Sequence, residues 1–162
     1  MQTMTENDFW SIIEDAWHAV DPQDQHRHAF LAGREPLYSS PHFHSVVRAM
    51  LRNLDIYLNT LEADTLLAFD RRMEQKLHTI DRADIHQYAQ GSDDGFLYIR
   101  GFIVAMGRQY YDLVNTKPSH ARQGYECERI CYIGADLYEE KFGEFPMSPI
   151  SRETGSNAAG WE

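Results

Sequence analysis

The chain has 162 residues, which is enough for one domain to bury a hydrophobic core without disulfides or a structural metal ion. Lys and Arg number 15 against 25 Asp and Glu, and the formal charge of −10 disfavours nucleic acid as a ligand. Solubility is the favoured interpretation of this charge, and a basic partner is the alternative that it suits. No secretory leader pattern opens the sequence and no window resembles a membrane span, so we expect a cytoplasmic protein without a membrane partner.

The first predicted helix covers residues 5–20. Thr5 followed by Asp8 is a capping pattern, and apolar residues recur after it at helical spacing. Trp10 and Trp17 lie seven residues apart and therefore share a second stripe on this helix. That stripe indicates packing against a neighbouring helix or, as the less favoured alternative, a contact surface for a partner.

Residues 21–41 lose this periodicity and are interrupted by Pro and Gly, so we expect an irregular connection with a short helical turn over 26–32. Helical spacing returns over 43–58 and, after a tight turn, over 66–80. The short turn predicts that these two helices form an antiparallel hairpin. Asp70 falls on or beside the apolar stripe, and we interpret it as a structural carboxylate that is satisfied by a partner.

The most apolar segment of the chain predicts one long, largely buried helix at about 93–114, around which the rest is organised. Ser92 is placed to cap its first turn. Asp93 and Asp94 put negative charge where the exposed N–H groups and the helix dipole favour it. Local chemistry alone therefore explains this acidic pair.

Two glycines inside the central segment, Gly101 and Gly107, lower helix propensity and predict places where another helix crosses closely. A last helix is predicted over 125–142, and Gly143 stands in the usual position for ending it. The following residues 144–162 are rich in Ser, Gly, Pro and Ala, and we expect them to be mobile.

Together these patterns predict an all-α fold, a single compact helical bundle of about six helices around the buried central helix, with no β-sheet. The helical domain is expected to cover residues 1–143 and to be followed by a flexible C-terminal tail over 144–162. Within that tail, Trp161 is the residue suited to finding a pocket.

Several short blocks give the chain a resemblance to a known family. They are Phe9-Trp10, Leu66-Leu67-Ala68-Phe69-Asp70, Ser92-Asp93-Asp94-Gly95-Phe96 with Arg100, Gly107-Arg108, and Tyr138-Glu139-Glu140-Lys141-Phe142-Gly143-Glu144. In this order they resemble the bacterial family called domain of unknown function 4240, and the Ser-Asp-Asp-Gly-Phe block is the most specific. The resemblance implies a small all-helical bacterial protein, related to a domain also found attached to regulatory and WGR-containing proteins, with no established activity. The chain departs from the family pattern at Phe102, where Trp is usual, and at Met106, where Gln is usual.

No set of residues in the sequence compels an enzymatic interpretation. The sharpest enzymatic hypothesis is a carboxylate site made of Asp93 and Asp94, with Arg100 two turns further on and Asp70 nearby. Neighbouring residues of a helix point about 100° apart, so the two acidic side chains cannot easily converge on one atom. Helix capping together with an ion pair is the better account, and we predict no catalytic residue.

Histidine and cysteine offer no stronger site. Histidine forms two His-x-His pairs, His26 with His28 and His42 with His44. Neither pair has a Cys or Glu at a metal-binding spacing, so we predict no metal ligands and no cofactor. Cys127 and Cys131 lie four residues apart in a helical pattern, and we expect reduced, packed thiols whose pKa values are raised by acidic neighbours.

Binding is therefore the favoured class of function. The prediction is a non-enzymatic acidic protein-binding module, most concretely an immunity or antitoxin-like protein that neutralises a basic toxin. The alternatives are a cytoplasmic regulatory or scaffold domain and a metal-dependent or carboxylate-based hydrolase. The oligomeric state stays open. The candidate binding residues are Trp10, Trp17, Asp93, Asp94, Arg100 and Arg108.

Overall fold

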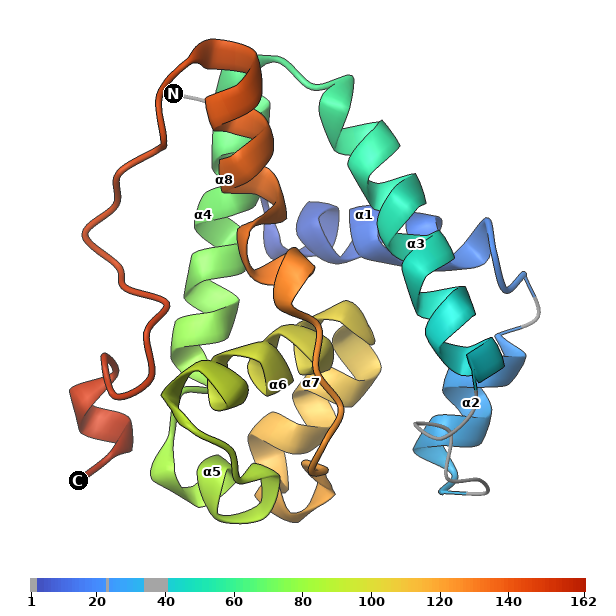
Figure 1. Cartoon of the computed structure of the whole chain (residues 1–162), viewed down its shortest axis with the longest axis vertical. Helices are drawn as coiled ribbons and strands as arrows, with labels where there is room; N and C mark the ends of the chain where they lie inside the picture. The colour runs from blue at the N-terminus through green and yellow to red at the C-terminus, as the bar shows by residue number, and fades with distance from the viewer. Residues whose placement is uncertain (1–2, 23, 34–40) are drawn as a thin grey trace.

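The computed structural model describes residues 3–22, 24–33 and 41–162. In these ranges the chain has eight α-helices, two short 3₁₀ helices and no strand, which confirms the predicted all-α class (Figure 1). The α-helices are α1 (Glu6–His18), α2 (Gln25–Leu31), α3 (Pro41–Asn59), α4 (Ala63–Thr79), α5 (Ala83–Ala89), α6 (Asp93–Ala105), α7 (Arg108–Thr116) and α8 (Glu128–Phe142), and the 3₁₀ helices are η2 (Pro118–His120) and η3 (Ala158–Gly160). None of the described helices is long and apolar enough to cross a membrane.

Short-range signals in the sequence explain several helix boundaries. The hydroxyl of Thr5 accepts a hydrogen bond from the Asp8 N–H at 3.1 Å, and the Asp8 carboxylate accepts from the Thr5 N–H at 3.2 Å, so the capping box is present. Ser92 accepts from the Gly95 N–H at 3.1 Å and caps α6 as predicted. Gly143 ends α8 in the left-handed conformation, with φ of 84°.

The core lies where α4, α6 and α8 meet (Figure 1). α8 runs along α4 and crosses α6, while α1 packs on α3 and α4. Phe9, Phe69 and Phe96 bring fully buried rings to this core from α1, α4 and α6. A Cβ atom on Gly101 would clash with the sulfur of Cys131, which confirms that another helix crosses α6 closely at this glycine.

The hairpin predicted for α3 and α4 is wrong. A short turn joins the two helices, but they diverge from it, and α3 packs on α1 and α8 rather than along α4 (Figure 1). α8 takes the place beside α4 that the hairpin partner would have filled. Helical periodicity identified both helices correctly, but it says only that an apolar face must be covered, not which helix covers it.

The central segment is two helices rather than the single one predicted at 93–114. α6 ends at Ala105 and α7 begins at Arg108, with Gly107 between them at φ of 95°. That conformation is strained for any other residue, and a Cβ atom there would also clash with the Glu14 carboxylate. Gly107 therefore lets the chain turn so that α7 packs back against α6.

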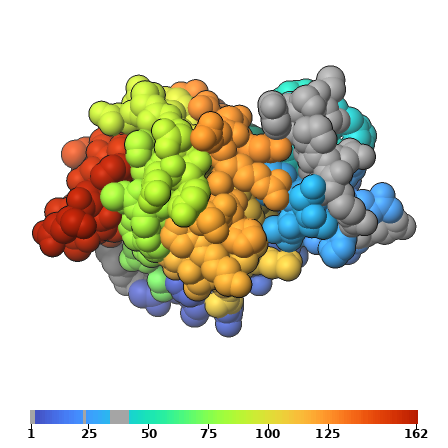
Figure 2. Space-filling model, turned by 90° about the horizontal axis from the view of Figure 1, so that it is seen from below, coloured from blue at the N-terminus to red at the C-terminus, as the bar shows by residue number. Residues whose placement is uncertain are grey.

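Residues 144–162, which we expected to form a flexible tail, lie along the outside of α4 and end beside α5 (Figure 1). Figure 2 shows this last segment against the residues around α5. Arg152 is buried, and Trp161 places its ring near His86 and Phe96. The packed structure therefore continues past the expected boundary at residue 143, because these side chains find partners that composition alone does not reveal.

Candidate functional site

The two tryptophans proposed as binding residues belong to the core. Trp17 is fully buried, and its indole N–H donates a hydrogen bond to the Ala105 carbonyl at 2.6 Å. Trp10 is 3% exposed and packs its ring against Tyr111, with the centroids 5.2 Å apart. Packing, the favoured interpretation of this stripe, accounts for both rings.

Arg100 is also buried, and it does not pair with the acidic residues at the start of its own helix. Its guanidinium donates to the Leu77 carbonyl at 2.9 Å, the Arg152 carbonyl at 2.9 Å and the Thr154 hydroxyl at 3.1 Å. Burial lowers the pKa of Arg100. The ion pair expected between Arg100 and the acidic pair is therefore wrong, and Arg100 holds the C-terminal segment instead.

The acidic pair itself is exposed and is part of a larger surface. We call this surface the acidic-tyrosine face. It consists of Asp93, Asp94, Tyr98, Glu126, Glu128, Tyr132 and Glu153. Its residues come from α6, from α8 and the segment before it, and from the C-terminal segment. The Cys127 N–H donates to the Tyr98 carbonyl at 2.9 Å, and this hydrogen bond fixes the segment before α8 against α6.

The charges of the acidic-tyrosine face act on its two phenols. Partial burial raises the pKa of Tyr98, and the carboxylates of Glu128 and Asp94 raise it further. Burial raises the pKa of Tyr132 as well, and the Glu153 carboxylate adds to that effect. The two half-buried rings therefore lie among several exposed negative charges.

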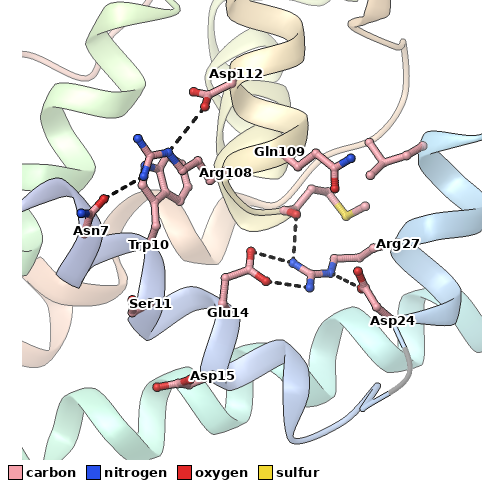
Figure 3. A pocket seen from close by; sticks show the side chains of 12 residues that line it. Asn7, Trp10, Ser11, Glu14, Asp15, Asp24, Arg27, Arg108, Gln109 and Asp112 are labelled. Atoms are coloured by element: carbon pink, nitrogen blue, oxygen red, sulfur yellow. Dashed lines mark hydrogen bonds and ion pairs between the residues drawn. The ribbon is translucent and has the colours of Figure 1, made fainter.

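Arg108, the remaining candidate, lines a pocket of about 590 Å³ between α1, α2 and α7 (Figure 3). The lining residues are Asn7, Trp10, Ser11, Glu14, Asp15, Asp24, Arg27, Leu31, Met106, Arg108, Gln109 and Asp112. Arg108 is exposed, donates to the Asn7 side chain at 2.8 Å and lies 3.5 Å from the Asp112 carboxylate. The volume is within the range of small-molecule sites, roughly 300–1,000 Å³.

One wall of this pocket is organised by Arg27, a residue that sequence reasoning missed. Its guanidinium donates to both carboxylate oxygens of Glu14, at 2.9 and 2.7 Å, and to Asp24 at 2.7 Å (Figure 3). Burial on its own lowers the pKa of Arg27, but Glu14 and Asp24 more than offset this and raise it. Both carboxylates are therefore committed to an ion pair. The sequence did contain a signal for this ion pair, which is the three-residue spacing of Asp24 and Arg27 at the start of a helical turn.

Asp70 is fully buried in α4, which confirms its interpretation as a structural carboxylate. Its partner is Arg152, whose Nη2 donates to Oδ2 of Asp70 at 2.7 Å and to Glu74 at 3.1 Å. Burial raises the pKa of Asp70, and the positive charge of Arg152 opposes that rise. Asp70 lies inside the core and Asp93 and Asp94 lie on the surface, so these carboxylates do not converge on one site.

The cysteines are free and buried, as predicted. Burial raises the pKa of Cys127 to about 11 and that of Cys131 to about 12, so burial rather than acidic neighbours is the main cause. One histidine from each His-x-His pair meets the other, since the rings of His26 and His42 have centroids 4.9 Å apart. Within the described part of the chain, no group of three or more His, Cys, Asp or Glu residues is arranged to hold a metal ion.

These features define a small all-helical protein with an acidic surface, a polar pocket and buried ion pairs. The chain belongs to the family described as protein of unknown function DUF4240, which matches residues 4–140 and confirms the resemblance. Comparison with curated proteins found no match, and comparison with solved structures found none either. The matched range contains the whole pocket and the buried acids of α4, whereas Arg152 and Glu153 lie beyond it.

Proposed function

We propose that this protein is a non-enzymatic protein-binding module whose acidic-tyrosine face binds a basic protein. The composition of that face carries the proposal, because five exposed carboxylates surround two half-buried tyrosines. Exposed carboxylates speed encounter with a basic partner, and tyrosine rings supply contact area with a polar tip. The formal charge of −10 on the whole chain acts in the same direction.

The most concrete form of this function is an immunity or antitoxin-like protein that neutralises a basic toxin. Neutralisation requires that the active surface of the toxin be covered. The protein that covers it needs to bind but does not need to catalyse a reaction. The acidic-tyrosine face suits that task because it rests on α6 and α8, which pack directly on each other. A face built on packed helices loses little conformational freedom on binding, so more of the contact energy remains for affinity.

An affinity capture with matched charge swaps tests the proposal. The tagged protein is incubated with lysate of the cells that naturally produce it, and bound proteins are identified by mass spectrometry. We expect one basic protein in stoichiometric amount, released at high salt. The double variant Asp94→Lys with Glu128→Lys is expected to lose this protein. Glu139→Lys with Glu140→Lys makes the same charge change at exposed positions of α8 outside the face and is expected to keep it.

The captured protein is then expressed alone and together with this chain. Growth arrest that the wild type relieves and the face variant does not would support neutralisation. A basic partner whose expression is harmless would leave the binding module in place and remove the toxin assignment. Equal capture by the two double variants would show that the acidic-tyrosine face is not the binding surface.

A further inference from the structure

The C-terminal segment is held by residues that act together like a peptide receptor. We propose that Asp70, Glu74, Asp81 and Arg100 form a binding site for an arginine-bearing peptide segment, and that residues 150–161 occupy it here as a tethered ligand. We call these four residues the receptor site and residues 150–161 the tail ligand. The inference rests on other contacts than the proposed function does, although Glu153 of the acidic-tyrosine face lies within the tail ligand.

The first anchor of the tail ligand is the Arg152 side chain. Its Nη2 donates to Asp70 at 2.7 Å and to Glu74 at 3.1 Å, and its Nη1 donates to the Cys131 carbonyl. The guanidinium also lies over the Tyr132 ring, 5.1 Å from its centroid. Arg152 is 6% exposed, so the receptor site encloses this side chain almost completely.

The receptor site also binds the main chain of the tail ligand. Asp81 accepts hydrogen bonds from the N–H groups of Gly155, at 3.1 Å, and Asn157, at 3.0 Å, one on each carboxylate oxygen. Arg100 donates to the carbonyl of Arg152 at 2.9 Å. Hydrogen bonds to the backbone of a bound segment contribute affinity, and pockets for selected side chains add specificity.

The second side-chain anchor is Trp161. Its indole N–H donates to Asp81 at 2.9 Å, and its ring lies 5.4 Å from that of His86 and 6.1 Å from that of Phe96, centroid to centroid. The tail ligand is therefore bound at both ends by large side chains and between them by its backbone. These contacts define the class of ligand. It is a peptide with an arginine, then a stretch whose backbone hydrogen-bonds with the receptor site, and then an aromatic residue.

The division between receptor and ligand follows the family boundary. The receptor site lies inside the family match at residues 4–140, and the whole tail ligand lies outside it. Asp70, Glu74 and Asp81 are all buried, and the hydrogen bonds that the Asp81 carboxylate accepts come from the tail ligand, from Gly155, Ser156, Asn157 and Trp161. Buried carboxylates require partners. The tail ligand supplies a cation to Asp70 and Glu74 and N–H donors to Asp81, while Arg71 also pairs with Glu74 at 3.2 Å.

A peptide-exchange experiment on the full chain tests this inference. A specific protease site is inserted between Gly143 and Glu144, which are both exposed, and the folded protein is cleaved there. Excess fluorescein-labelled peptide of residues 144–162 is then added, and bound label is measured after size exclusion. We expect incorporation to approach one peptide per protein, with the far-UV circular dichroism unchanged.

Two unlabelled competitor peptides make the test specific. The peptide with Met147→Ala, which changes a side chain that is 83% exposed and lies outside the tail ligand, is expected to compete like the wild type. The peptide with Arg152→Ala is expected to compete at least tenfold more weakly. Equal competition by both peptides, no incorporation of label, or unfolding of the cleaved protein would each overturn the proposal. None of these outcomes bears on the charge-swap capture, so the two proposals fail separately.

Discussion

Nη2 of Arg152 donates to Oδ2 of Asp70 at 2.7 Å, and 82 residues of sequence separate the two. Both side chains are buried, so water screens their attraction very little. The same burial makes either charge costly when its partner is missing. This pair therefore ties the C-terminal segment to the core more firmly than a surface ion pair would.

Replacing Arg152 by Met is expected to lower the free energy of unfolding by roughly 3–5 kcal/mol, because it removes the close counter-ion of the buried Asp70 and leaves it with Arg71 at 4.0 Å. Urea denaturation followed by circular dichroism measures the change. Arg129→Met is the matched control, since it removes an exposed pair with Asp55 at 2.7 Å and is expected to cost at most about 1 kcal/mol. Equal losses in the two variants would show that the buried Arg152 pair contributes no more to the free energy of unfolding than an exposed pair does.

Gly107→Ala is expected to destabilise the protein more than Gly124→Ala. Both glycines have positive φ, 95° and 80°, so both variants carry a backbone penalty of about 1–2 kcal/mol. Only at Gly107 does the added Cβ meet neighbours, the Glu14 carboxylate and Arg27, whereas nothing lies within 4 Å at Gly124. Thermal unfolding of both variants measures the difference. A smaller loss at Gly107 would contradict the clash at the break between α6 and α7.

Asp93→Asn combined with Asp94→Asn is expected to cost on the order of 1 kcal/mol, through lost interaction with the N-terminal end of the α6 dipole. The loss should shrink in high salt, because both side chains are exposed. Asp136→Asn, at an exposed position in the middle of α8, serves as the control and is expected to change stability little. A loss that salt does not alter would assign the acidic pair another role.

Stability is expected to fall as the pH rises from 9 towards 11. An unfolded thiol titrates near 9, whereas burial raises the pKa of folded Cys127 to about 11. In this window the unfolded state binds fewer protons than the folded state, so the free energy of unfolding decreases by up to about 1.4 kcal/mol per pH unit for this thiol. Urea midpoints of the wild type and Cys127→Ala across pH 8–11 measure it. If the urea midpoints of the two proteins changed in parallel with pH, the result would contradict a raised pKa for Cys127.

The sequence was sufficient where a feature depends on neighbours in the chain. Thr5 with Asp8, Ser92 and Gly143 act within one helical turn, and each helix end that they predicted is present. The fully buried Asp70 also followed from local pattern, because an acid on an apolar stripe needs a partner. What the pattern could not supply was the identity of that partner.

The features that the sequence did not predict depend on contacts between residues that are far apart in the chain. Periodicity runs through Gly107 without interruption, so the break appears only in the structure, where Gly107 has a φ of 95° and lies against Glu14. Arg152 stands in a segment whose Ser, Gly and Pro content is typical of mobile tails, and its role depends on acids in α4. Arg100 was paired in sequence with the acids nearest to it, while its actual partners include the Leu77 carbonyl and Thr154.

The order of synthesis gives the Arg152 pair a kinetic consequence. Asp70 leaves the ribosome long before Arg152, and translation of the 82 intervening steps takes roughly 4–16 s at about 5–20 residues per second. During that interval Asp70 and Glu74 lack Arg152, and the cation already present is Arg71, which lies 4.0 Å from Asp70 and 3.2 Å from Glu74 in the folded protein. The contact that ties the C-terminal segment to α4 is therefore among the last to form, because it waits for the final part of the chain to be made.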